Sequence, residues 1–118
     1  MIVDIDMKLP SLNEYVAACR SSAYKGARMK REYEDRIAWF LTKLPRFTKP
    51  VVIQFTWIEE NEKRDLDNIA FAKKFILDAL VRYGKLKNDN RQYVRGFSDS
   101  FLGGDKTHVL VAIEEVMG

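Results

Sequence analysis

The chain has 118 residues, a formal net charge of +3, and only one histidine and one cysteine. This length provides one domain with a modest core, and 47% apolar residues indicate a folded chain rather than a disordered one. One histidine and one cysteine cannot build a zinc site, a Ser-His-Asp triad or a Cys-His pair with any redundancy. Any catalytic chemistry is therefore expected from carboxylates that hold a hard metal ion.

The start of the chain and its cysteine content indicate a cytoplasmic location. Residues 2–7 alternate in polarity and lack the basic and apolar regions of a signal peptide. No apolar run approaches the roughly 20 residues of a membrane span, and a single cysteine excludes an intrachain disulfide. We therefore predict a cytoplasmic protein with no membrane partner.

The N-terminal half predicts a strand, two helices and a second strand. The first strand is expected over residues 2–8, and the capping box Ser11-Leu12-Asn13-Glu14 predicts a short helix over 13–20. A longer helix is expected over 27–44, with an apolar face formed by Tyr33, Ile37, Phe40, Leu41 and Leu44. The β-branched and aromatic run at 51–58 predicts a central strand. The core is also expected to contain Cys19, Trp39 and Trp57.

The C-terminal half predicts a third helix and two more strands. The helix is expected over 68–83, and its core face contains Ile69, Ala72, Ile76, Ala79, Leu80 and Tyr83. Strands are expected over 92–97 and 107–116, with a hairpin turn at Gly103-Gly104. The order β-α-α-β-α-β-β predicts a single small α+β domain with a mixed or antiparallel sheet.

Two turn-prone segments concentrate carboxylates. They are Arg64-Asp65-Leu66-Asp67-Asn68 and, further along the chain, Asn88-Asp89-Asn90. Alternate residues of an extended segment project to the same side, so Asp65 and Asp67 can face one pocket. Mg²⁺ prefers such oxygen ligands, and phosphate chemistry on this ion requires no histidine base. The alternative is structural, with Asp67 or Asn68 capping a helix and Asp89 in a simple turn.

Basic residues are concentrated away from these carboxylates. Between residues 20 and 31 there is no acid, and the basic side chains are Arg20, Lys25, Arg28, Lys30 and Arg31. A basic surface beside an acidic pocket suits a nuclease, which must hold both phosphates and cations. Lys74 lies on the same side of the predicted helix as Asp67, where a lysine can stabilise negative charge. Its alternative role is a surface ion pair with Asp78, four residues later.

At these residues the chain resembles the RusA family of Holliday-junction resolvases. The matching segments are Leu9-Pro10-Ser11-Leu12-Asn13, Arg64-Asp65-Leu66-Asp67-Asn68, Asp78-Ala79-Leu80, Asp89 with Tyr93-Val94, and Gly103-Gly104 before the last strand. These segments keep the family's order across nearly the whole chain. The resemblance implies one RusA-like endonuclease domain over residues 1–118, of the kind that phages and prophages commonly encode.

The resemblance also implies an activity and a site. It implies a homodimer that binds four-way DNA junctions and resolves them by paired symmetric cuts in DNA recombination and repair, with Mg²⁺ or Mn²⁺ as cofactor. Asp65, Asp67 and Asp89 match the family's metal-binding aspartates, and Lys74, counted back from Asp78, matches its essential lysine. We expect DNA contacts from Arg20, Lys25, Arg28, Lys30, Arg31, Arg64 and Lys73.

Two other functions fit the same residues. The chain can be a non-catalytic module that binds branched DNA, in which the aspartates serve only as helix caps and turn residues. It can also be a metal nuclease that acts on other branched DNA. A dimer suits the leading hypothesis, because a four-way junction has approximate two-fold symmetry and its resolution needs two cuts.

Overall fold

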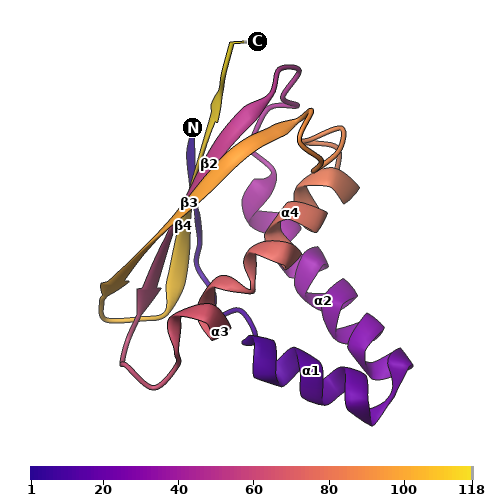
Figure 1. Ribbon diagram of the computed structural model, residues 1–118, viewed down its shortest axis with the longest axis vertical. Helices are drawn as coiled ribbons and strands as arrows, with labels where there is room; N and C mark the ends of the chain where they lie inside the picture. The colour runs from indigo at the N-terminus through magenta and orange to yellow at the C-terminus, as the bar shows by residue number, and fades with distance from the viewer. Residues whose placement is uncertain (118) are drawn as a thin grey trace.

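The computed structural model of the chain describes residues 1–117 as one β-sheet with helices on one of its faces (Figure 1). Its elements are β1 (Ile2–Ile5), α1 (Leu12–Ser21), α2 (Ala23–Leu41), β2 (Val51–Glu59), α3 (Leu66–Ala70), α4 (Lys73–Arg82), β3 (Val94–Gly103) and β4 (His108–Glu115). The predicted α+β class with a mixed sheet is confirmed.

The sheet combines parallel and antiparallel pairs in the order β1-β4-β2-β3. β2 and β3 are parallel and are linked through α3 and α4, whereas β4 is antiparallel to both β1 and β2. The predicted hairpin between the last two strands is therefore wrong, because β4 pairs with β2 instead of β3. After β3 the chain crosses the end of β2, where the Gly104 N–H donates to the Glu59 carbonyl at 3.1 Å. A Cβ on Gly104 would lie 2.6 Å from Ile58, so this crossing requires a glycine.

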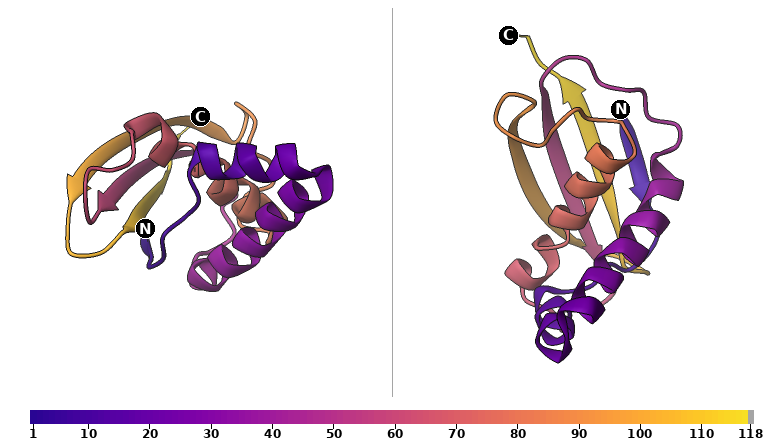
Figure 2. Two further views of the ribbon diagram at one scale, coloured as in Figure 1. Left: turned by 90° about the horizontal axis from the view of Figure 1, so that it is seen from below. Right: turned by 90° about the vertical axis from the view of Figure 1, so that its right-hand side faces the viewer.

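The helices cover one face of the sheet and bury its alternate side chains (Figure 2). The buried residues of β2 are Val51, Ile53, Phe55 and Trp57, and the residues between them face the other side of the sheet. The predicted apolar faces of the helices are buried against this core at Ile37, Leu41, Leu44, Ile69, Ala72, Ile76, Ala79 and Leu80. Hydrophobic periodicity therefore identified much of the part of the core that the helices contribute.

The helix predicted over 68–83 is two helices, α3 and α4, which meet at Phe71 and Ala72. The hydrogen bonds tighten at this junction, where the Ala72 N–H donates to the Ile69 carbonyl at 3.2 Å. The Phe71 ring also stacks on Tyr15 of α1, with ring centroids 5.5 Å apart. Packing of Phe71 against α1 thus accompanies the change in helix direction.

α1 and α2 form a tight helical hairpin around Ser22. The predicted capping box is present, since Ser11 Oγ accepts the Glu14 N–H at 3.1 Å and Glu14 accepts the Ser11 N–H at 3.3 Å. α2 begins at Ala23, earlier than predicted, because Ser22 ends α1 and also caps α2 by accepting the Lys25 N–H at 3.0 Å.

Three side chains expected in the core lie at the surface. Trp39 is 76% exposed and Tyr83 is 40% exposed, and Cys19 is exposed as well. Trp39 is two residues from both Ile37 and Leu41, which places it about 200° around the helix from each of these buried residues. Apolar character alone therefore misplaced it.

Candidate functional site

Asp65 and Asp67 lie at the start of α3 with exposed carboxylates that make no hydrogen bond or ion pair within residues 1–117. Asp65 occupies the N-cap position with extended backbone, but its side chain accepts no capping hydrogen bond. The neighbouring Asn68 side chain accepts the Asn13 N–H at 3.0 Å and so links α3 to α1. Helix capping, the structural alternative for this motif, is not performed by these side chains.

Arg64 fixes the backbone immediately before the two aspartates. Its guanidinium donates to both carboxylate oxygens of Glu59 at 2.9 and 2.8 Å, and also to the Leu9 carbonyl at 2.9 Å. Only 15% of the Arg64 side chain is exposed. This bidentate pair ties the loop to the end of β2, so its first effect is to position Asp65 rather than to present a free cation.

A pocket of about 600 Å³ adjoins the motif. It is formed by the loop after β2, the start of α3 and the end of β3, and its acidic lining residues without an ion pair are Glu60, Glu62 and Asp65. Ile69 and Phe101 contribute apolar surface to the same pocket. Asp65 thus lines an acidic pocket, whereas Asp67, expected to face the same pocket, is not among its lining residues.

Asp89 lies in the loop between α4 and β3, and its neighbours form the turn. Asn88 Oδ1 accepts the Asn90 N–H at 3.0 Å, and Asn90 Oδ1 accepts the Gln92 N–H at 3.0 Å. The Asp89 carboxylate is exposed and has no partner in the described part of the chain. The asparagines thus account for the turn, and Asp89 is left free.

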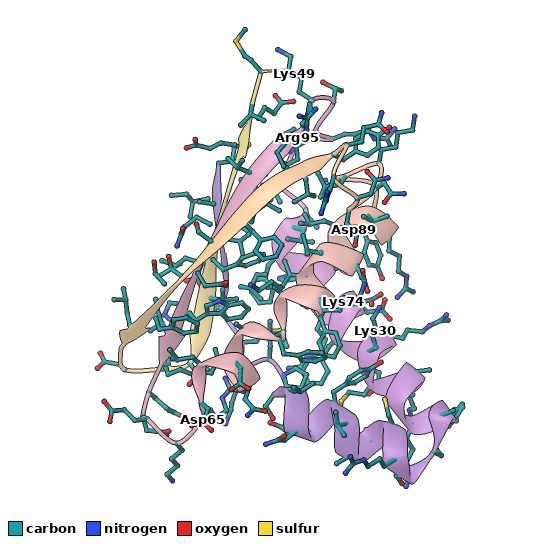
Figure 3. All side chains as sticks on the ribbon, in the orientation of Figure 1. Lys30, Lys49, Asp65, Lys74, Asp89 and Arg95 are labelled. Carbon is teal, nitrogen blue, oxygen red and sulfur yellow. The ribbon has the colours of Figure 1, made fainter. Side chains whose placement is uncertain are left out.

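One chain does not bring the three aspartates together. Asp65 and Asp67 lie before and within α3, Asp89 follows α4, and Figure 3 shows Asp65 and Asp89 well apart along this segment. The 10 residues of α4 alone span about 15 Å. Among residues 1–117 there is no group of three or more histidine, cysteine, aspartate or glutamate side chains able to hold a metal ion. Asp65 and Asp89 therefore lie at the two ends of the α3–α4 segment and do not belong to one carboxylate cluster in the described chain.

Lys73, predicted to contact DNA, is engaged inside the protein. Its ammonium lies 2.5 Å from Asp99 Oδ2, and the side chains are only 18% and 21% exposed. The other Asp99 oxygen accepts the Trp57 indole N–H at 2.8 Å. The Lys73 ammonium also lies 4.3 Å from the Phe97 ring centroid. Lys73 thus joins the start of α4 to the edge strand β3.

The predicted basic surface of α1 and α2 is exposed, but part of its charge is paired. Arg28 lies 2.9 Å from Glu32, and Lys30 lies 2.7 Å from Asp78 on α4. The exposed basic residues without a carboxylate partner in the described structure are Arg20, Lys25 and Arg31. These three are the stronger candidates for contact with an external phosphate.

An ion network between α2 and α4 was not predicted from sequence. Glu34 is buried and accepts from Lys30 and, at 3.3 Å, from Arg82, while Asp78 accepts from Lys30 and from Lys74 at 3.2 Å. Partial burial raises the pKa of Asp78, but the hydrogen bonds from the two lysines outweigh it and hold that pKa below its ordinary value. Glu34 lies three residues before Ile37 and so shares the apolar face of the helix. An acid on such a face was the signal that could have revealed it.

Lys74 pairs with Asp78, which is the structural role that the sequence analysis gave as the alternative for this lysine. Even so, 57% of the Lys74 side chain is exposed, so its ammonium stays accessible from outside. A surface pair of this kind is weak, about 0.3–0.5 kcal/mol. The pair therefore leaves the Lys74 ammonium available to an external group.

Neither models of known protein families nor curated protein sequences gave a match to this chain. No helix in residues 1–117 combines the length and the apolar character that crossing a membrane requires.

Proposed function

We propose that the protein is a metal-dependent endodeoxyribonuclease of the RusA type that resolves four-way DNA junctions. One observation carries the proposal: the three aspartates singled out from sequence are all exposed and disengaged, while other residues perform the structural tasks around them. By contrast, acids such as Glu34, Glu59 and Asp99 are held in ion pairs. Carboxylates that carry no structural role remain available to bind a hard cation.

The separation of the aspartates adds a condition to this proposal. The three carboxylates of a single subunit lie too far apart to bind one ion together. The proposal therefore includes Mg²⁺ or Mn²⁺ only in combination with a homodimer. In a two-fold dimer with antiparallel α3–α4 segments, the Asp65 and Asp67 end of one subunit faces the Asp89 end of the other. The paired cuts of junction resolution call for the same symmetry.

The first experiment compares wild type with Asp67→Asn on an end-labelled synthetic four-way junction, with Mg²⁺, with Mn²⁺ or with EDTA. We expect paired symmetric cuts by wild type only with metal, and binding without cutting by the variant, since a negative charge near phosphate is removed. Asp105→Asn is the matched control, because Asp105 is an exposed aspartate that does not line this pocket and has no partner in the described structure. Equal cleavage rates for Asp67→Asn and wild type would show that the site assignment is wrong. Flaps and replication forks in the same assay test the alternative of a nuclease for other branched DNA.

Mixing two inactive variants tests the shared site. In heterodimers of Asp67→Asn and Asp89→Asn, one composite site carries both changes and the other carries neither. Random subunit exchange should therefore restore cleavage at about a quarter of all sites. If each subunit contained its own complete site, the mixture would stay inactive.

The second candidate is a branched-DNA-binding module without catalytic activity. It is favoured by the absence of a three-carboxylate cluster within one described chain. This candidate predicts junction binding with no cleavage under Mg²⁺ and Mn²⁺ alike.

A further inference from the structure

Two loops distant in sequence meet at the end of the molecule opposite the α1–α2 turn (Figure 1). They are residues 42–50, between α2 and β2, and residues 84–95, which lead from α4 into β3. The Phe47 N–H donates to the Lys85 carbonyl at 2.9 Å, and the Val51 N–H donates to the Tyr93 carbonyl at 2.8 Å. The Lys85 ammonium also donates to the Leu44 carbonyl at 2.7 Å.

Apolar side chains anchor the two loops beneath these hydrogen bonds. Leu44, Phe47 and Leu86 are buried in the main core. Gly84 turns the chain out of α4 with a φ of 77°, a conformation that favours glycine. The hydrogen bonds and the buried apolar side chains therefore hold the two loops together as one ordered surface.

This surface, here named the basic platform, concentrates positive charge. Its basic residues are Lys43, Arg46, Lys49, Lys85, Lys87, Arg91 and Arg95, and its one acid is Asp89. Seven basic residues against one acid give these segments +6, twice the +3 of the whole chain. Figure 3 shows both Lys49 and Arg95 at this end of the molecule.

Six of the seven basic side chains of the platform make no ion pair within residues 1–117. Lysines and arginines of α2 and α4 pair with carboxylates, as Lys30 does with Glu34 and Lys73 with Asp99. On the platform, the side chains without a carboxylate partner among residues 1–117 are Lys43, Arg46, Lys49, Lys85, Lys87 and Arg91. The nearby Glu115 carboxylate accepts from the backbone N–H groups of Thr48 and Lys49 instead.

We propose that the basic platform binds the phosphate backbone of DNA. This inference rests on the proposed function for the choice of DNA as ligand, and it adds a contact surface separate from the basic residues of α1 and α2. No large apolar side chain on the platform is exposed, so insertion into a lipid surface is not favoured. Lysines and arginines on an ordered surface suit contacts with DNA phosphates that do not depend on the base sequence. Asp89 lies between Lys87 and Arg91 in the second loop, so a phosphate held by these two residues lies close to one of the three predicted site residues.

The test measures the salt dependence of junction binding in EDTA, where cleavage plays no part. The platform variant is Lys87→Gln with Arg91→Gln, because both residues are exposed and neither donates a hydrogen bond that joins the loops. The control is Lys8→Gln with Lys63→Gln, two exposed lysines outside the platform whose replacement changes net charge equally. Binding of a fluorescent four-way junction is followed by anisotropy from about 50 to 200 mM KCl.

We expect the platform variant to reduce the log–log salt slope by up to about 1.8, or about 0.9 for each phosphate that is no longer neutralised, and the control to keep the wild-type slope. Equal slopes and affinities for the two double variants would overturn the inference, as would a wild type that binds no DNA. A wild type that binds through the platform but never cuts with metal would instead refute only the proposed nuclease function.

Discussion

Two adjacent lysines at the start of α4 allow a direct separation of stability from function. Lys73 is 18% exposed and pairs with Asp99, whereas Lys74 is 57% exposed and pairs with Asp78. We predict that Lys73→Ala destabilises the fold and that Lys74→Ala does not. The proposed function adds that Lys74→Ala slows junction cleavage while Lys73→Ala, once folded, binds DNA nearly as wild type does.

The expected sizes follow from burial. Removing one partner of a fully buried ion pair costs about 3–5 kcal/mol, because the other charge is left without compensation. About a fifth of each side chain in the Lys73–Asp99 pair is exposed, so we expect roughly 2–3 kcal/mol. This range includes the interaction of the Lys73 ammonium with the Phe97 ring, which the substitution also removes. For Lys74→Ala we expect less than about 0.5 kcal/mol, the usual value of an exposed i,i+4 pair.

Urea unfolding of the two variants and wild type measures these differences, and thermal unfolding provides an independent check. A decrease of 2–3 kcal/mol corresponds to a melting temperature lower by roughly 10 °C for a domain of this size. A Lys73→Ala variant as stable as Lys74→Ala would refute the structural role of the pair. If that variant also lowered the salt slope of DNA binding by about 0.9, Lys73 would be a phosphate contact, as the sequence analysis predicted.

Two further predictions concern the network between α2 and α4. Glu34→Ala leaves Lys30 and Arg82 without their shared buried acceptor. Both cations are partly exposed and keep Asp78 and Asp35 as partners, so urea unfolding should show a destabilisation of about 1–2 kcal/mol, below the value for a fully buried pair. Glu32→Ala, at an exposed pair, should cost under about 0.5 kcal/mol. The pKa of Asp78 is lower in the folded protein than its ordinary value. The stabilisation that ionised Asp78 contributes to the fold is therefore complete above the pKa of Asp78 in the unfolded state. It disappears as the pH falls through the pKa of Asp78 in the folded state. Asp78→Asn should accordingly flatten the acid limb of the stability curve below about pH 4, and an unchanged acid limb would contradict this assignment.

Local sequence patterns predicted the helices and strands well, because the local sequence of each one determines which of its residues are buried. The structure shows that Val51, Ile53, Phe55 and Trp57 are the covered residues of β2, and the sequence predicted only the strand itself from its β-branched and aromatic run. This run carried no information about the neighbouring strands, because both edges of a strand offer the same backbone groups. The placement of β4 between β1 and β2 depends on partners far away in sequence. A pair of glycines before the last strand therefore suggested a hairpin that the fold does not contain.

The candidate site shows the same limit at the level of side chains. The sequence located Asp65 and Asp67 at a helix start, and the structure has them there. It did not give the distance to Asp89, which depends on α4 lying between the two segments. Likewise, the basic residues of the two platform loops are unremarkable until Phe47 and Lys85 are seen to join them.

The arrangement of charge links the two proposals. Asp65, with Asp67 two residues later, lies beside the acidic pocket at one end of the α3–α4 segment, while Asp89 lies in a loop of the basic platform at the other end. Within one subunit, phosphate binding and the aspartate pair are therefore separated by the length of α4. In the proposed two-fold dimer, the platform of each subunit supplies both Asp89 and phosphate contacts to the aspartate pair of its partner. Binding that is weakened in the platform variant but kept in Asp67→Asn, together with restored cleavage in the mixed variants, is the combination of results that this arrangement requires.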